Sequence, residues 1–229
     1  MLMRMDFMKW LNSLGELLYE VMSWLIFYPI TLWRTVTRPL QMMGYSNREL
    51  TDQADEQFTD TLNPPLFLVL SLLLTQELDK ALGGGTNPII RKNTGLAGMI
   101  NDDTTLLVLR LVLFSLFPLM MAARFLRAKG VKVTRNGLRA PFYAQCYACA
   151  PFALTLGIGL SLQHLRGETE QAIGAVLALG SMVAYLGTET IWFARGLQQG
   201  VVRAAGHALL AFVAAAVIAL ALGALIVTR

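Results

Sequence analysis

Hydrophobic residues fill most of the chain in long segments that are separated by polar connections. A helix needs about 20 mostly apolar residues to cross roughly 30 Å of hydrocarbon, and five segments approach that length. They are residues 65–82, 104–126, 140–162, 171–194 and 204–227. This pattern predicts an all-α fold, an integral membrane bundle of five transmembrane helices over residues 63–229. The connections are short, except for a glycine-rich segment at residues 83–103.

The N-terminal part has a different pattern. Between Phe7 and Leu25, apolar residues recur at helical spacing, and Glu16 and Glu20 fall on the opposite side. Such a helix lies in the membrane interface with its apolar face in lipid. The segment Val21–Trp33 is continuously apolar but short for a span, and Pro29 interrupts it. We therefore expect an amphipathic interfacial helix before the bundle, while a re-entrant piece or a tilted sixth span stays open.

An acidic stretch at residues 49–60 follows this helix. Its spacing lacks the Asp-x-Asp-x-Asp-Gly pattern of an EF-hand loop, so we interpret it as a solvated linker or helix face rather than a cation site. Residues 1–62 are then a cytoplasmic and interfacial segment that precedes the bundle.

Composition agrees with a membrane protein. The 229-residue chain is 55% hydrophobic and 15% charged, whereas soluble domains carry about 25% charged residues. Basic residues without acids occupy residues 124–139, between the second and third segments, and Arg195 and Arg203 flank the connection between the last two. Because basic loops face the cytoplasm, we expect a multi-pass inner-membrane protein with a cytoplasmic N-terminus and an outer C-terminus.

Placing an ionisable residue inside a membrane-spanning helix costs free energy, so such residues usually pair with another polar group or belong to a functional site. The candidate intramembrane polar site consists of Glu77, Arg110, Tyr143, Gln145, Tyr147, Glu189 and His207. Glu77 and Arg110 lie at similar depth in adjacent segments, which predicts an ion pair. The set forms either a polar pathway or headgroup pocket, or a group of contacts that holds the bundle together and reaches the interface.

The basic connection predicts contact with anionic lipid, because Lys and Arg beside the inner leaflet attract its headgroups. The candidate headgroup-binding residues are Arg127, Lys129, Lys132, Arg135 and Arg139. Aromatic residues are not interleaved with them, so we expect no nucleic-acid binding. The expected partners are membrane lipids, with a homo-oligomer or a membrane-protein complex left open.

The only two cysteines form a Cys-x-x-Cys pattern, Cys146 and Cys149, within an apolar helix. A redox-active cysteine pair needs a solvent-exposed helix N-terminus that stabilises the thiolate. A closed zinc site needs two further ligands beside the two cysteines. We interpret both as small packing residues and expect no metal and no cofactor. Gly157, Gly159 and Gly174 predict close helix contacts, either within the bundle or at an oligomer seam, as does Gly180.

The layout resembles the Yip family of five-span membrane proteins. The similarity rests on "YPITLWRTVTRP" before the spans, on "YAQCYACAPFAL" in the third span, and on "IWFARGLQQGVVRAAGHALLAF" around the last connection. The resemblance implies the five-span fold over about residues 25–229 and offers no catalytic residues to transfer. The acidic motif of the eukaryotic members is missing, so an interaction with Rab GTPases does not follow.

The sequence contains no phosphate-binding glycine loop, nucleophile elbow or His-Glu-x-x-His pattern. We therefore expect a non-enzymatic integral membrane protein that acts in membrane or lipid organisation, or as a subunit of a membrane complex. A small transporter or channel with an intramembrane polar pathway is the alternative. A membrane enzyme that uses the cysteines, or the His and Glu residues, is the third class.

Overall fold

A computed structural model describes residues 2–54, 56–82, 103–165 and 167–228. These residues form seven helices and no strand, which confirms the all-α fold class. The helices are α1 (Leu2–Thr37), α2 (Pro39–Glu49), α3 (Pro64–Ala81), α5 (Asp103–Ala128), α6 (Arg135–Gln163), α7 (Glu168–Leu197) and α8 (Val201–Thr228). The glycine-rich connection at 83–103 lies almost entirely outside the described residues.

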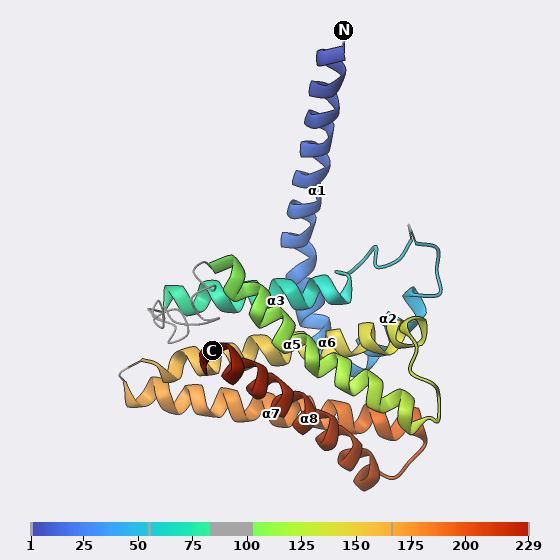
Figure 1. The fold of residues 1–229 in the computed structure, drawn as a ribbon, viewed down its shortest axis with the longest axis vertical. Coiled ribbons are helices and arrows are strands. Elements are labelled where there is room, and N and C mark those ends of the chain that lie inside the picture. The colour runs from blue at the N-terminus through green and yellow to red at the C-terminus, as the bar shows by residue number, and fades with distance from the viewer. Residues whose placement is uncertain (1, 55, 83–102, 166, 229) are drawn as a thin grey trace.

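Five helices run side by side with alternating directions, as Figure 1 shows for α3, α5, α6, α7 and α8. The helix α6 is central, because it packs on α2, α3, α5 and α7, while α8 closes the bundle against α5 and α7. In its apolar window 61% of residues are buried, against 17–22% in α5, α7 and α8. Polar side chains in the middle of α6, such as Gln145 and Tyr147, are therefore held inside the protein.

Within the described residues, four helices are long and apolar enough to cross a membrane: α5 from Leu107, α6, α7, and α8 as far as Leu225. The predicted first span is not among them. It folds as α3, which has 18 residues and carries Glu77, Asp79 and Lys80 in its last turns. The structure thus supports a helical protein with four candidate spans, and the five-span count is not confirmed.

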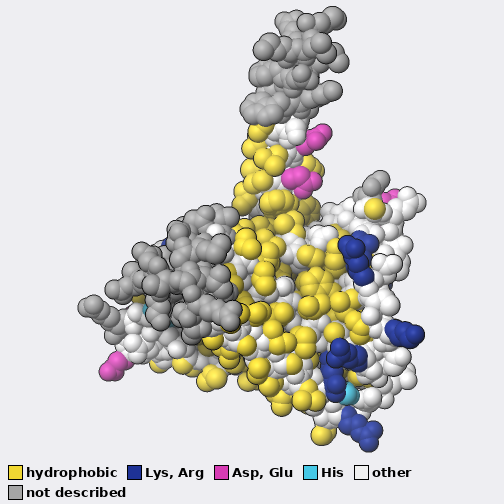
Figure 2. All heavy atoms as spheres, viewed as in Figure 1, with side chains coloured by type: hydrophobic (Ala, Val, Ile, Leu, Met, Phe, Trp, Pro, Cys, Tyr) yellow, Lys and Arg dark blue, Asp and Glu magenta, His cyan; other side chains and the backbone are white. Residues whose placement is uncertain are grey.

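The outer faces of α7 and α8 are apolar and exposed, as Val183 (72%) and Val202 (87%) illustrate. Figure 2 shows hydrophobic side chains over the middle of the bundle and Lys and Arg side chains at one end. An apolar surface of this extent is unusual for a soluble monomer, and a lipid environment accounts for it.

The N-terminal helix α1 is continuous through Pro29 and ends at Thr37. Its C-terminal part packs on α2, α3 and α6, and its N-terminal part projects away, crosswise to the bundle helices (Figure 1). Leu18, Met22 and Ile26 on the projecting part are about 60% exposed. The helix therefore projects from the side of the bundle and does not run alongside the candidate spans (Figure 1). Its location in the membrane interface stays a prediction.

The backbone of α6 closely approaches the backbone of α7 and a side chain of α3. A Cβ added to Gly159 would lie 2.7 Å from the Gly174 carbonyl oxygen, and one added to Gly157 would lie 2.0 Å from Thr75 Cγ2. The prediction of tight packing is confirmed at Gly157, Gly159 and Gly174. Gly180 differs, because nothing lies within 4 Å of an added Cβ there.

Candidate buried polar centre and lipid-facing grooves

Glu189 is the most deeply buried acid among the described residues. It lies on α7 against α6 and is 0% exposed, as is Gln145 on α6. The Gln145 amide approaches the Glu189 carboxyl, yet none of these four polar atoms makes a well-formed hydrogen bond within the described part of the chain. Because burial of an unpaired polar group costs free energy, the arrangement calls for a functional explanation.

Tyr185 completes this group. It precedes Glu189 by one turn on the same face of α7 and is 3% exposed. Its ring stacks on Phe152 with centroids 4.7 Å apart, while its hydroxyl has no hydrogen-bond partner among the described residues. We name Gln145, Tyr185 and Glu189 the buried polar centre. Sequence reasoning missed Tyr185, although its spacing of four from Glu189 was the available signal.

The two cysteines lie close to this centre on α6. Both are free and fully buried, and Cys149 Sγ is 3.8 Å from the Phe114 carbonyl oxygen. Among the described residues, no three His, Cys, Asp or Glu side chains gather as a metal site would require. The contacts are those of small core residues.

Tyr147 belongs to a different network, at the junction of α6 with the loop before α3. Its hydroxyl donates to the Leu62 carbonyl at 2.7 Å and lies 3.1 Å from the Thr61 hydroxyl. The Leu62 amide donates to the Thr31 hydroxyl of α1 at 3.0 Å. Tyr147 thus ties the N-terminal segment to the central helix and lies apart from the buried polar centre.

The acidic stretch takes part in the same junction. Asp60 accepts hydrogen bonds from Arg34 at 2.8 Å and from Tyr45. Burial would raise the pKa of Asp60, but the hydrogen bonds from Tyr45 and Arg34 outweigh it and hold that pKa below its usual value. Glu49 accepts from the Phe58 amide. These acids fix the loop, so the interpretation of the whole stretch as a solvated linker is too simple.

The predicted pair of Glu77 with Arg110 is wrong. Arg110 contacts Asp79 instead, at 3.2 Å, and Ser161 of α6 donates to the same carboxylate at 2.7 Å. Glu77 is 63% exposed and pairs with Lys80 in its own helix at 2.9 Å. Two residues along α3 turn the side chain by about 200°, so Asp79 faces α5 while Glu77 faces outward.

Tyr143 and His207 lie near the basic end of the bundle. The Tyr143 ring is 5.5 Å from the Arg139 guanidinium and contacts the Phe58 ring. His207 Nδ1 accepts from Arg124 Nε at 3.1 Å, which joins α8 to α5. The structure thus divides the predicted polar set into separate groups, and it brings together only Gln145 and Glu189.

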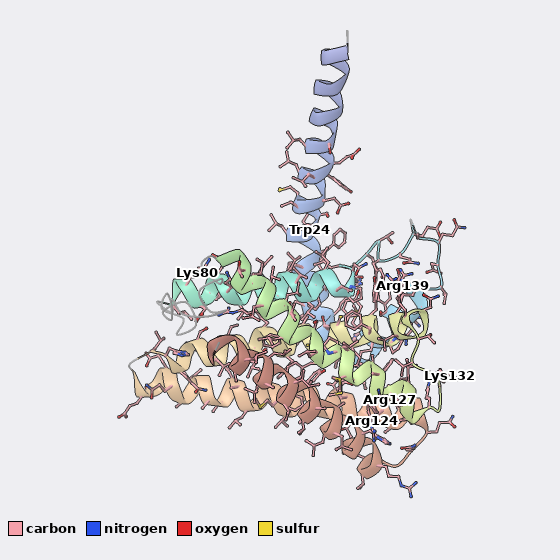
Figure 3. All side chains as sticks on the ribbon, viewed as in Figure 1. Trp24, Lys80, Arg124, Arg127, Lys132 and Arg139 are labelled. Atoms are coloured by element: carbon pink, nitrogen blue, oxygen red, sulfur yellow. The ribbon has the colours of Figure 1, made fainter. Side chains whose placement is uncertain are left out.

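The predicted headgroup-binding residues lie at this same end. Figure 3 shows Arg124, Arg127, Lys132 and Arg139 at the end of the bundle opposite Lys80. All five residues of the predicted set are exposed: Arg127, Lys129, Lys132, Arg135 and Arg139. Lys129 also covers the Phe125 ring at 4.7 Å.

A cavity of about 430 Å³ lies between α7, α6 and the corner where α1 meets α2. Val36, Pro39, Val176 and Gly180 give it an apolar wall, and Tyr185 also borders it. A second cavity of about 220 Å³ lies between Leu40 of α2 and the α7 residues Trp192, Arg195 and Gly196. Their α7 residues lie along one face of the helix, so the two cavities follow one another along α7, and we name the pair the α7 groove.

A third cavity of about 210 Å³ separates α5 from α8 on another side of the bundle. Arg124 and Arg127 border it together with the α8 residues Leu210 and Ala214. An apolar depression bordered by arginine therefore occurs twice at the basic end of the protein.

No family model, curated protein or solved structure matches the chain.

Proposed function

We propose that this is a non-enzymatic integral membrane protein that acts in membrane or lipid organisation by binding phospholipid in the α7 groove. One observation carries the proposal. The apolar cavity of about 430 Å³ is followed on the same face of α7 by a cavity with an arginine. We assign an acyl chain to the first cavity and a phosphate to the second.

The chemistry of the smaller cavity supports this assignment. Arg195 supplies a guanidinium, which binds phosphate through paired donors. The Trp192 indole Nε1 is buried and has no acceptor among the described residues, so it offers a further donor. The two residues are three apart on α7, and such residues share a face. Anionic headgroups should bind more tightly than neutral ones, because the basic residues at this end of the bundle attract negative charge.

The orientation that this proposal uses places the basic end at the cytoplasmic leaflet of the inner membrane, as the positive-inside rule suggests. The Yip-like layout and a complex with further membrane proteins are compatible with the proposal and remain predictions.

The test compares lipid-dependent stability of two matched pairs of variants. Purified protein in neutral lipid nanodiscs should melt at higher temperature when phosphatidylglycerol is added, and Arg195→Gln should remove most of that gain. Arg203→Gln is the control, because Arg203 is exposed and borders neither cavity. Gly180→Leu should fill the larger cavity and lower lipid occupancy, measured by native mass spectrometry. Gly187→Leu, on the open surface of the same helix, should not.

If phosphatidylglycerol raises the melting temperature of Arg195→Gln as much as that of wild type, the assignment of the headgroup to the smaller cavity is wrong. If Gly180→Leu binds as much lipid as wild type, the assignment of the acyl chain to the larger cavity is wrong.

A small transporter or channel is the second candidate function. The buried polar centre favours it, because ionisable groups inside membrane bundles often belong to ion or substrate pathways. Ion flux into proteoliposomes tests this candidate separately from lipid binding.

A further inference from the structure

We propose that the buried polar centre of Gln145, Tyr185 and Glu189 binds one small monovalent metal cation of the sodium class. This site is independent of the α7 groove as a lipid site, although Tyr185 borders both.

The unpaired atoms carry the proposal. None of the Glu189 carboxyl oxygens, the Gln145 amide oxygen or the Tyr185 hydroxyl makes a well-formed hydrogen bond among the described residues, although the Gln145 amide approaches the Glu189 carboxyl. All three side chains are at least 97% buried. Buried polar atoms in native proteins are almost always satisfied, so several together at one contact between two helices indicate a missing partner.

The donor set defines the chemistry of that partner. A carboxylate, an amide carbonyl and a hydroxyl are the oxygen ligands that hard cations prefer. The neighbouring thiols of Cys146 and Cys149 are soft ligands and add nothing to such a site. The arrangement therefore fits an alkali cation better than copper or zinc.

The charge of the centre favours a monovalent cation over a divalent one. Glu189 is the one carboxylate of the centre, and within the described residues no Lys, Arg or His makes an ion pair or a hydrogen bond with it. A monovalent cation makes the centre neutral, whereas a divalent cation would leave an uncompensated charge in the apolar interior, which is costly.

The geometry also provides rigid support for the ligands. Tyr185 is held by its stacking on Phe152. The same two helices are also held together by the backbone contact of Gly159 with Gly174, which lies about 16–23 Å along the helices from the centre. A site on two firmly packed helices is pre-organised, so binding costs little reorganisation.

The experiment is a cation titration on purified wild-type protein in nanodiscs of phosphatidylcholine alone. Sodium, lithium and potassium chloride are each compared with N-methylglucamine chloride at constant ionic strength. At least one alkali cation should raise the melting temperature saturably, by about 5–10 °C at 100 times its Kd. Equilibrium binding of radioactive sodium should saturate near one ion per chain.

Variants assign the effect to the centre. Glu189→Gln should lose the cation-dependent shift and melt at higher temperature than wild type in N-methylglucamine, because the uncompensated charge is gone. Tyr185→Phe keeps the stacked ring and should weaken apparent affinity at least 10-fold. Glu77→Gln is the matched control and should behave as wild type, since Glu77 is exposed and paired with Lys80.

Two results would overturn the proposal. One is a wild-type melting temperature that is the same in every alkali cation as in N-methylglucamine, which would mean that the carboxyl holds a proton instead. The other is a cation shift that survives in both Glu189→Gln and Tyr185→Phe. If Glu189→Gln fails to fold, the Tyr185→Phe titration decides alone.

Discussion

At the scale of single residues, the ion pair of Asp79 with Arg110 joins α3 to α5. Both side chains are about one-fifth exposed, and Ser161 adds a hydrogen bond from α6. Removing one partner leaves the other charge poorly solvated, so Asp79→Asn or Arg110→Gln should each destabilise the protein by about 1–3 kcal/mol. The double variant Asp79→Arg with Arg110→Asp should recover part of that loss. Reversible unfolding in SDS measures these differences.

Glu77→Gln is the control for this prediction, because its pair with Lys80 is exposed and exposed pairs contribute about 0–1 kcal/mol. Equal losses for Glu77→Gln and Asp79→Asn would show that the assigned pairing is wrong.

At this scale, the sequence identified the buried polar residues better than it identified which side chains they contact. Glu189 and Gln145 stood out because polar groups are rare in apolar helices, and the structure brings them together. The choice between Glu77 and Asp79 depended on helix rotation, which segment length alone does not give. Tyr185 was overlooked because a tyrosine in an apolar run looks like any other aromatic.

At the scale of elements, the contact of α6 with α7 depends on two glycines. A Cβ at Gly174 would lie 2.5 Å from the Gly159 carbonyl oxygen and 3.1 Å from the Gln163 amide nitrogen, and backbone atoms cannot move aside as side chains do. We expect Gly174→Ala to force the helices apart and cost about 1–3 kcal/mol, measured as a loss of thermal stability in detergent.

Gly187→Ala on the same helix provides the comparison. Nothing lies within 4 Å of its added Cβ, and alanine favours helix more than glycine does. Stability should therefore stay equal or rise slightly. A Gly174→Ala protein as stable as Gly187→Ala would contradict the close contact.

The four long apolar helices were predictable because their hydrophobic runs exceed the length of any turn or loop. Residues 104–126, for example, fall within α5, which runs from Asp103 to Ala128. The helix α2 was missed because its 11 residues contain no long apolar run, and it is held by contacts with α6 that local pattern does not reveal. The α1 segment was predicted as helix, but its continuation through Pro29 was not.

At the scale of the whole molecule, the two ends of the bundle differ in charge, and this difference determines the expected orientation. Lys132 lies at the basic end (Figure 3), and Glu170 lies in the first turn of α7, at the other end of the bundle (Figure 1). By the positive-inside rule, Lys132 should face the cytoplasm and Glu170 the outside.

Single cysteines can test this orientation, because both native thiols are buried and we expect alanine to replace them without loss of the fold. In a Cys146→Ala, Cys149→Ala background, a membrane-impermeant maleimide should label Glu170→Cys in intact cells. It should label Lys132→Cys only after the membrane is opened. The wild-type thiols should stay unlabelled in both conditions until the protein is denatured, because both are 0% exposed. The reverse labelling pattern would place the basic end outside, and the phosphate cavity at Arg195 would then face the outer leaflet.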